Sequence, residues 1–360
     1  MNLGLVTTSY PRFHGDPAGN FVEEHARALR ALGHSVHVIA AGDGKPEREG
    51  VIRIASPLFY GGGAPDQIER SFVRSLFAGA SFTARMTAAV RSHSRSWDAI
   101  IAHWLAPSAL ASLPARKPLV AIAHGGDVHT LRAHGLLRST LRALVARRAT
   151  LVFVNRELLA LARAEVPALE AIVQPMGLDL DRFRAIRRVP TTPPTILVVA
   201  RLVPVKGVDV VLTAFEQLAT PARLVIAGDG PMRAQLEARA KRFASVEFVG
   251  AVDTDTRDRL LGQASVVVVP SRILETGRTE GTPLVALEAL AAGIPVVASS
   301  VGGLADLAAI CHVPPDDPRA LAAAIDQVIY EPPAASDLQA SVAHLGSLEV
   351  ARRLLPELAS

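Results

Sequence analysis

The segment Glu280-Gly281-Thr282-Pro283-Leu284-Val285-Ala286-Leu287-Glu288 decides how the rest of the chain is interpreted. Gly281 allows a close backbone approach, and Pro283 suits the first turn of a helix, where its missing N–H costs nothing. We expect this helix to run over Leu284–Ala292 and to end at Gly293. The glycine-containing turn therefore opens directly into a helix.

The amino end of this helix is expected to meet an anion. The first amides of a helix have no acceptor within the helix, and they point at whatever lies above its end. Glu280 precedes this helix and Glu288 lies on it, and carboxylates are poor phosphate ligands but good acceptors for sugar hydroxyls. The segment thus indicates a ligand with both phosphates and sugars. The alternative is a capped helix after a buried strand, with both glutamates in solvent.

Length and composition indicate a globular protein of two domains. The 360 residues, 49% of them hydrophobic and 20% charged, exceed what one core usually supports. A single cysteine, Cys311, excludes an internal disulfide framework and fits a reducing compartment. The start of the chain lacks the basic region of a signal peptide, and no apolar run approaches the roughly 18 residues of a membrane span. We therefore expect a cytoplasmic protein.

The two halves of the chain differ in charge. Residues 1–190 carry +9 and residues 191–360 carry −5, which together give the net charge of +4. A basic first half indicates an anionic partner, such as a phosphorylated acceptor, a membrane surface or nucleic acid. Aromatic residues make up only 4% of the chain and no basic-aromatic RNA motif is present, so no nucleic acid partner is expected.

Short apolar runs alternate with helical patterns in both halves. Such runs are typical of buried parallel strands, and the alternation predicts an α/β protein of two doubly wound sheets, with ligands beyond the carboxyl ends of the strands. The first half has expected strands at 3–8, 35–41, 99–103, 119–123, 151–154 and 171–174, and helices at 21–32, 72–92, 106–113, 131–148 and 157–164. The second half has expected strands at 195–200, 222–227, 246–249, 265–270, 295–299 and 309–313, and helices at 207–217, 232–242, 257–264, 284–292 and 318–329.

Three prolines between Arg187 and Pro194 stiffen the chain and forbid a helix, so we place the domain linker there. The expected domains are residues 1–188 and 189–333. Residues 334–360 are expected to form a helix or helix pair that adds no strand and packs back toward the first domain.

Two cations follow the first strand of the second half. Arg201 and Lys206 share one loop, and Gly207 admits a tight turn into the next helix. The planar guanidinium of an arginine donates paired hydrogen bonds, and the ammonium of a lysine provides a compact positive charge. The two together suit the binding of a diphosphate. The alternative is a surface loop with solvated charges. Two neighbouring strands end in glycine-containing segments, Gly228-Asp229-Gly230-Pro231 and Gly250. Their backbones could approach a nucleotide closely, and the alternative is an ordinary turn.

In the first half, His124 follows an expected strand and is succeeded by two glycines and Asp127. A histidine at the carboxyl end of a strand could meet a substrate, although lone histidines are more often structural. His103 stands at the end of another expected strand and is a weaker candidate for the same role.

Several chemistries have no motif in this chain. No spacing resembles a zinc or two-metal site, and neither Asp253-x-Asp255 nor Asp179-x-Asp181 stands where it could hold a divalent ion on phosphates. A Gly-x-Ser-x-Gly, a Walker loop and the Gly-x-Gly-x-x-Gly of dinucleotide dehydrogenases are also missing.

Taken together, these motifs resemble the retaining glycosyltransferases of family four, which have the GT-B fold. The resemblance covers nearly the whole chain and is strongest over residues 195–318. Glu280 and Glu288, with seven residues between them, resemble the family's signature, and Arg201 with Lys206 resembles its diphosphate clamp. One position differs from the family pattern: Asp306, after the double glycine Gly302-Gly303, stands where the family more often has glutamate. Further motifs stand in family order: Gly19, Met176-Gly177-Leu178-Asp179, Phe248-x-Gly250, Pro270-Ser271, Ala291-x-Gly293-x-Pro295 and Gly302-Gly303.

The resemblance implies a role for each site residue. Arg201 and Lys206 would neutralise the leaving diphosphate, so that no metal or other cofactor is expected. His124 would contact the donor sugar and, through its carbonyl, stabilise the developing oxocarbenium charge without a covalent nucleophile. Glu280 would bind donor-sugar hydroxyls and Glu288 those of the ribose. The rest of the donor site would consist of Gly19, Asp127, Gly250, Gly281, Thr282, Pro283, Leu284 and Val285.

The predicted function is transfer of a sugar, with retained configuration, from a nucleotide-diphosphate sugar to a glycan, glycolipid or lipid-linked saccharide. UDP is the expected nucleotide, with GDP next. The alternative is a GT-B-like epimerase or binding protein that transfers nothing. Epimerases place an acid or base against the sugar, and His124 and Asp127 lack an obvious partner base, which favours transfer.

A membrane surface is a further expected partner. Leu131 to Arg148 carries five arginines among leucines and a valine, a pattern typical of a basic amphipathic helix on anionic lipid. The alternative is an ordinary domain helix with a solvated arginine face.

Overall fold

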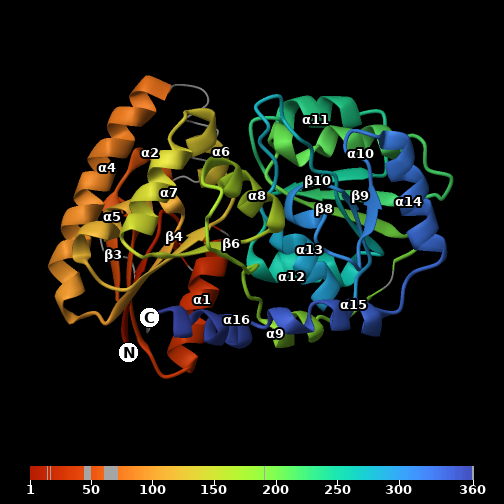
Figure 1. The fold of residues 1–360 in the computed structure, drawn as a ribbon. Helices are drawn as coiled ribbons and strands as arrows, with labels where there is room; N and C mark the ends of the chain where they lie inside the picture. Colours follow the sequence, from red (N-terminus) through yellow and green to blue (C-terminus); the bar gives the residue numbers. More distant parts are fainter. Residues whose placement is uncertain (14, 17, 44–49, 61–71, 190, 359–360) are drawn as a thin grey trace. The chain divides into compact units, whose positions relative to one another are not determined.

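The computed structural model describes the chain except residues 14, 17, 44–49, 61–71, 190 and 359–360. The chain divides into two compact units, Met1–Gly177 with Ser347–Ser360, and Leu178–Gly346. Each unit is built around one parallel sheet (Figure 1).

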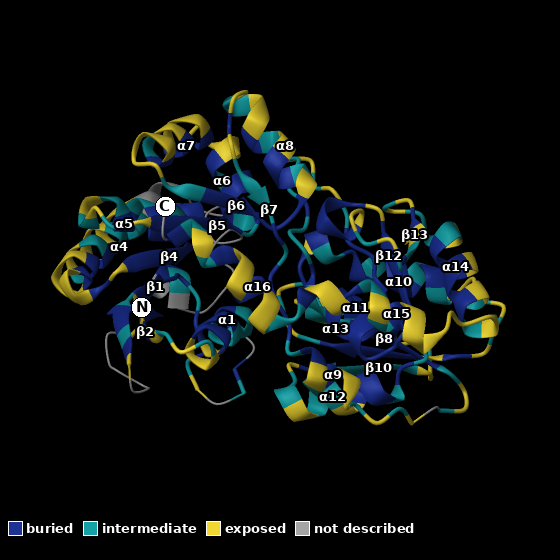
Figure 2. Ribbon diagram, turned by 60° about the horizontal axis from the view of Figure 1, so that its bottom comes forward, coloured by how far each residue is buried: buried dark blue, intermediate teal, exposed yellow. Residues whose placement is uncertain are grey.

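The described part of the first unit holds a seven-stranded sheet in the order β3-β2-β1-β4-β5-β6-β7, with all neighbours parallel. Strand β4 is buried at every position and dark blue in Figure 2, as expected for a strand covered on both faces. The order reverses between β1 and β4, which makes their carboxyl ends the switch point of this unit. The strands are Asn2–Val6 (β1), Ser35–Gly42 (β2), Val51–Ala55 (β3), Ala99–His103 (β4), Leu119–Ala123 (β5), Thr150–Phe153 (β6) and Ile172–Val173 (β7).

Strand β3 was absent from the sequence prediction. It contains Arg53, whose charge interrupts the apolar run that marks a buried strand. The structure buries this arginine, and its Nη1 donates to the carbonyls of Tyr10 and Ala41, each over 3.0 Å. Tertiary hydrogen bonds therefore satisfy a charge that the local pattern could not explain.

Helices cover both faces of this sheet. Helix α4 lies along the β2-β3 edge, and α16, blue in Figure 1, packs against α1, red. The helices are Asn20–Ala31 (α1), Pro57–Tyr60 (α2), Phe72–His93 (α4), Leu110–Ser112 (α5), Gly126–Ala133 (α6), Leu137–Ala146 (α7), Arg156–Glu165 (α8) and Ser347–Leu354 (α16).

The single helix expected over residues 131–148 is wrong, because α6 ends at Ala133 and α7 begins at Leu137. Gly135 adopts a left-handed φ of 68° and closes α6 with a Schellman motif. In this motif the Leu136 amide donates to the Leu131 carbonyl and the Gly135 amide to that of Arg132.

The described residues of the second unit hold a six-stranded parallel sheet in the order β10-β9-β8-β11-β12-β13. Its switch point lies between β8 and β11. All six strands match the predicted runs, and β11 is four buried valines. The strands are Thr195–Val199 (β8), Arg223–Ala227 (β9), Val246–Gly250 (β10), Val266–Val269 (β11), Val296–Ser299 (β12) and Cys311–Val313 (β13).

Two hydrophobic cores lie on the two faces of the second sheet. Successive side chains of a strand point to opposite faces, so Leu197 of β8 joins one core while Ile196 and Val198 join the other. The helices that close these cores are Leu180–Arg184 (α9), Val208–Phe215 (α10), Arg233–Ala240 (α11), Thr254–Gln263 (α12), Leu284–Ala291 (α13), Pro318–Tyr330 (α14) and Ala335–Ser341 (α15).

The boundary between the units differs from the one expected at residues 188 and 189. Leu180 and Phe183 of α9 are buried in a core of the second unit, and α9 packs on α13. Residues 178–188 therefore belong with the second unit. The final segment is also divided, because α15 packs on α13 in the second unit whereas α16 packs on α1 in the first.

Candidate active site

Lys206 and Glu280 form an ion pair at the carboxyl end of the second sheet. Lys206 ends the 3-10 helix Pro204–Lys206 after β8, and Glu280 lies in the loop between β11 and α13. The Lys206 Nζ is 2.6 Å from the Glu280 Oε1, and the Ser271 hydroxyl donates to the same oxygen over 3.2 Å. The side chains are only 24% and 11% exposed, so solvent screens this pair less than a surface pair. The structure thus brings together two residues predicted for the site, at the switch point.

A close backbone contact explains how the two loops meet. Gly207 follows Lys206 with a left-handed φ of 59°, and a Cβ built there would lie 2.0 Å from the Pro270 carbonyl oxygen. Any larger residue would push the loop after β8 away from the end of β11. Gly207 therefore sets the position from which Lys206 reaches Glu280.

The pair Gly302-Gly303 supports the turn at Glu280. A Cβ on Gly302 would lie 2.3 Å from the Glu280 carbonyl oxygen, and one on Gly303 would lie 2.4 Å from that of Gly281. The Gly303 amide also donates to the Gly281 carbonyl over 2.7 Å. The double glycine thus allows a second loop to pack directly on the predicted turn.

Helix α13 begins with its amino end beside this turn. Pro283 is the N-cap residue, and no side chain among the described residues caps the helix. Leu284 and Val285 occupy the first turn, where amides have no acceptor within the helix. Thr282 and Gly281 precede them in the turn. The helix therefore begins where the sequence predicted, and binding of an anion at its amino end stays a prediction.

Glu288 is ion-paired with an arginine that sequence analysis missed. Its Oε1 lies 3.1 Å from the Arg257 Nη1 on α12, and the residue is only 3% exposed. Burial raises the pKa of Glu288, against the lowering effect of the charges on Arg257 and Arg182. Arg257 lies in a polar helical pattern with no motif around it, so only the fold could reveal this contact.

The other predicted residues of this unit are placed as follows. Arg201 is exposed on the loop after β8. Gly250 ends β10, which is separated from β8 by β9, and its carbonyl accepts the Gly228 amide over 2.7 Å.

In the first unit, His124 belongs to a chain of three histidines at the switch point. We call His25, His103 and His124 the histidine chain. His103 ends β4, His124 follows β5 and His25 lies on α1. The His103 Nδ1 is 3.0 Å from the His124 Nε2, and the His25 Nδ1 is 3.2 Å from the His103 Nε2.

Burial keeps the histidine chain uncharged at neutral pH. It lowers the pKa of His25 to about 4 and that of His124 to about 3, and it lowers the pKa of His103 as well, with help from the neighbouring histidines. His124 keeps partial exposure, whereas the other two are buried. A neutral, partly exposed imidazole can exchange hydrogen bonds with a ligand, but it is a weak general base.

Two aromatic rings enclose His124. The ring centroids of Phe21 and Trp104 lie 5.0 Å and 4.9 Å from that of His124. Trp104 holds a φ of 73°, which is uncommon for a bulky residue and typical of functional sites. Neither ring was predicted for the site, and the unusual backbone of Trp104 has no sequence signal.

Asp127 holds two loops together through hydrogen bonds to backbone amides. The residue is 7% exposed, and its carboxylate accepts the backbone amides of Leu105, His124 and Gly125 over 2.7, 3.2 and 3.0 Å. Burial raises the pKa of Asp127, and these backbone hydrogen bonds oppose that effect. We therefore assign Asp127 a loop-positioning role, and its contact with the donor stays a prediction. Gly19 is the N-cap residue of α1 and lies against the backbone of Ser9.

We expect the protein to lose stability as the pH falls from about 6.5 toward 4. The pKa of His25 is about 4 in the folded protein and about 6.5 in an unfolded chain, so the unfolded chain binds the proton first. The free energy of unfolding is therefore highest above pH 6.5, and His25 alone removes about 2 kcal/mol by pH 5. Thermal midpoints at pH 7 and pH 5 measure this loss. A His25→Phe variant should show a flatter dependence, and an unchanged slope would contradict the assignment.

Metal-ligand clusters and membrane-spanning helices are both absent from the described residues. No group of three or more His, Cys, Asp or Glu residues there is arranged to hold a metal ion. No helix among the described residues is both long enough and apolar enough to cross a membrane.

Two doubly wound parallel sheets, each with its candidate residues at a switch point, define the GT-B class of α/β enzymes. A family model described as "Glycosyl transferases group 1" matches residues 193–331, and one described as "Glycosyltransferase Family 4" matches residues 18–182. The chain belongs to this family of group 1, family 4 glycosyltransferases. The predicted family and fold are thereby confirmed.

Known proteins resemble the chain over different lengths. TuaC of Bacillus subtilis, a protein named for teichuronic acid biosynthesis, is 27% identical over 95% of this chain and 94% of its own. A GDP-mannose-dependent phosphatidylinositol monomannoside mannosyltransferase of Mycobacterium tuberculosis is 35% identical over 39% of this chain and 41% of its own. Curated relatives above 30% identity align over only 36–41% of their own length. Among solved structures, Anabaena HepE in complex with UDP and glucose has a TM-score of 0.74 at 18% identity, covering all of both chains.

Proposed function

We propose that the chain is a retaining glycosyltransferase that moves a sugar from a UDP-sugar to a glycan, glycolipid or lipid-linked saccharide. The observation that carries this proposal is the contact of Lys206 with Glu280 beside the amino end of α13. It joins a cation suited to a leaving diphosphate with an acceptor suited to sugar hydroxyls. The HepE complex with UDP and glucose supports the donor class, and the name of TuaC, which refers to teichuronic acid biosynthesis, supports a glycan acceptor.

The proposed mechanism relies on electrostatic stabilisation. When the bond between the sugar and the diphosphate breaks, negative charge grows on the diphosphate, where Lys206, Arg201 and the first amides of α13 would stabilise it. Glu280 would orient the sugar, Glu288 the ribose, and the His124 carbonyl would face the positive charge on the sugar. Burial lowers the pKa of His124, and the Asp127 carboxylate accepts backbone amides, which favours transfer over the acid–base chemistry of an epimerase.

A thermal-shift panel tests the donor class. A ligand that binds the folded state stabilises it by mass action, by roughly 2.7 kcal/mol at a concentration of 100 Kd. We expect UDP to raise the midpoint more than GDP or ADP, and the correct UDP-sugar to be consumed with an acceptor glycan. A larger rise of the thermal midpoint with GDP would indicate that the donor nucleotide is GDP and not UDP. Isomerised donor without transfer would support the epimerase instead.

Transfer is expected to be independent of metal ions, because two side-chain cations and a helix end are available for the diphosphate. Prior treatment with a chelator should change the initial rate of transfer by less than about twofold. Loss of the rate together with rescue by a divalent ion would contradict this expectation.

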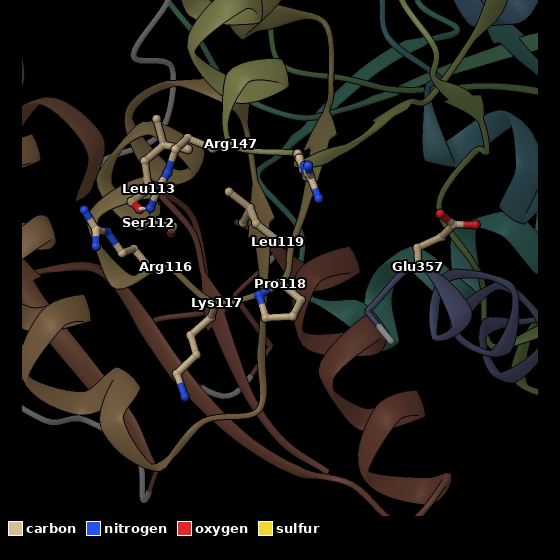
Figure 3. Close-up of a pocket in the computed structure, with 9 residues that line it drawn as sticks. Ser112, Leu113, Arg116, Lys117, Pro118, Leu119, Arg147 and Glu357 are labelled. Atoms are coloured by element: carbon tan, nitrogen blue, oxygen red, sulfur yellow. Dashed lines mark hydrogen bonds between the residues drawn. The ribbon is translucent and has the colours of Figure 1, made fainter. Parts of the chain in front are cut away.

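We also propose a cytoplasmic location with peripheral contact to the inner face of the cell membrane, mainly through exposed cations. Leu137, Leu141 and Leu144 of α7 are buried in the unit and are not available to lipid, whereas Leu136 and Val145 are exposed. Figure 3 shows a pocket at the start of β5, the end of the strand opposite His124, with Arg116, Lys117 and Arg147 around it. Arg148 also lines this pocket, and Glu357 is its single acidic residue.

Sedimentation with vesicles tests this contact. An anionic surface attracts each nearby cation by about 1 kcal/mol, and salt weakens the attraction. We expect binding to anionic vesicles that falls with salt and falls again in an Arg147→Gln/Arg148→Gln variant, with Arg223→Gln as the control. Equal binding to neutral and anionic vesicles would contradict the proposal.

A further inference from the structure

The two bonds of the histidine chain have the geometry of directed hydrogen bonds. The ring planes of His103 and His124 differ by only 10°, and the 3.0 Å between their nitrogens accounts for most of the 5.1 Å between the ring centroids. The rings therefore meet edge to edge, along the direction of a nitrogen lone pair. His25 meets His103 at 77°, again through one nitrogen of each ring.

Neutrality makes the three rings share one tautomer. A neutral imidazole carries one proton, so one nitrogen donates and the other accepts. Each bond of the chain joins an Nδ1 to an Nε2. If His103 donates from Nδ1, His124 must accept at Nε2, and His25 must donate from its own Nδ1. The reverse direction protonates Nε2 in all three rings. A mixed arrangement would break one bond or place two protons in it.

The ends of the histidine chain have different surroundings. The His25 Nε2 is buried and has no partner among the described residues. The structure records no bond from a described carboxylate to any of the three rings, and Asp127 meets only the backbone of His124. At the other end, His124 is partly exposed, and its Nδ1 is not among the buried unpaired atoms of the described residues. A ligand could therefore reach the three histidines at His124 and not at the buried His25.

We propose that His103 and His25 are positioning residues that fix the tautomer of His124, so that its Nδ1 presents one defined hydrogen-bonding role to the donor sugar. The tautomer of a histidine is set by the bond that its other nitrogen makes, and here that bond comes from His103. Phe21 and Trp104 lie against the His124 ring and shield it from water that could exchange the tautomers. The proposal rests on the proposed function only in assigning a sugar to His124.

The tautomers can be measured in the free protein. Long-range ¹H–¹⁵N correlation spectra of the full chain labelled at histidine distinguish a proton on Nδ1 from one on Nε2. We expect His25, His103 and His124 to show the same tautomer at pH 7. Different tautomers on His103 and His124 would overturn the proposal. The measurement needs no substrate, so a shared tautomer in a protein without transfer activity would support the histidine chain and contradict the proposed function.

Variants then connect the tautomer to turnover. His103→Phe removes both bonds, and we expect His124 to become a mixture of tautomers while kcat falls by roughly tenfold, as for other residues that orient a site ligand. The KM for the donor should change less than kcat. His25→Phe keeps the hydrogen bond between His103 and His124 and should make the tautomer of His124 less uniform. This variant provides a test if His103→Phe does not fold. His129→Phe, another buried histidine of the same unit, is the control and should leave the His124 spectrum unchanged. A His124 spectrum and kcat that stay as in the parent protein after His103→Phe would overturn the proposal.

Discussion

Replacing Lys206 with alanine should lower kcat for sugar transfer by a factor of about 10²–10³, the loss expected when one preorganised donor to a developing anion is removed. The Nζ of Lys206 is 2.6 Å from Glu280 and its side chain is only 24% exposed, so solvent would screen its attraction to a diphosphate at this site less than that of a surface lysine. Affinity for UDP should fall as well, because the product carries the same diphosphate. Initial rates and calorimetric titration with UDP measure the two effects.

The matched control is Lys241→Ala. Lys241 is an exposed lysine of the same unit, at the end of α11, and its removal should leave both kcat and UDP affinity unchanged. Lys206→Arg keeps the charge but changes its geometry, and we expect an intermediate rate. If Lys206→Ala turned over the donor as fast as the parent protein, the proposed role of Lys206 in the mechanism would be wrong.

The parts of the site that are local in sequence were predictable. The turn from Glu280 into α13 is encoded by Gly281 and Pro283, and the structure places the helix start where those residues put it. The strands of the second unit were found because each is a short apolar run buried on both faces. Gly135 carried a readable signal for the end of α6 that the arginine pattern around it obscured.

The contacts between distant residues were not predictable. Lys206 and Glu280 were assigned to different parts of the ligand, and only the packing of Gly207 on Pro270 shows that the two side chains meet. Arg257 and His25 lie on helices whose patterns fit ordinary amphipathic segments, and their partners come from other elements. Such contacts depend on the register between elements, which periodicity along the chain does not contain.

Replacing Glu280 with alanine should separate binding of the nucleotide from turnover. The substitution removes the acceptor proposed for the sugar hydroxyls, so we expect kcat to fall by about 10² or more. It also removes the carboxylate that pairs with Lys206, which leaves the Lys206 charge available to a diphosphate. UDP affinity should therefore stay the same or rise while turnover is lost, the opposite of the joint loss expected for Lys206→Ala.

Comparing the changes in UDP affinity and in kcat decides between two roles of Glu280. If Glu280 mainly supports the fold of its turn, its removal also misplaces Lys206 and the start of α13, and UDP affinity falls in step with kcat. If Glu280 contacts the sugar, calorimetry with UDP alone is unaffected, and the defect appears only with the intact donor. Glu280→Gln keeps the shape and one acceptor oxygen and should retain more activity than Glu280→Ala. Glu247→Ala, at an exposed glutamate of β10, is the control for loss of a negative charge in this unit. The double variant Lys206→Ala/Glu280→Ala should be no slower than about the slower single variant, because residues that act as one unit are not additive.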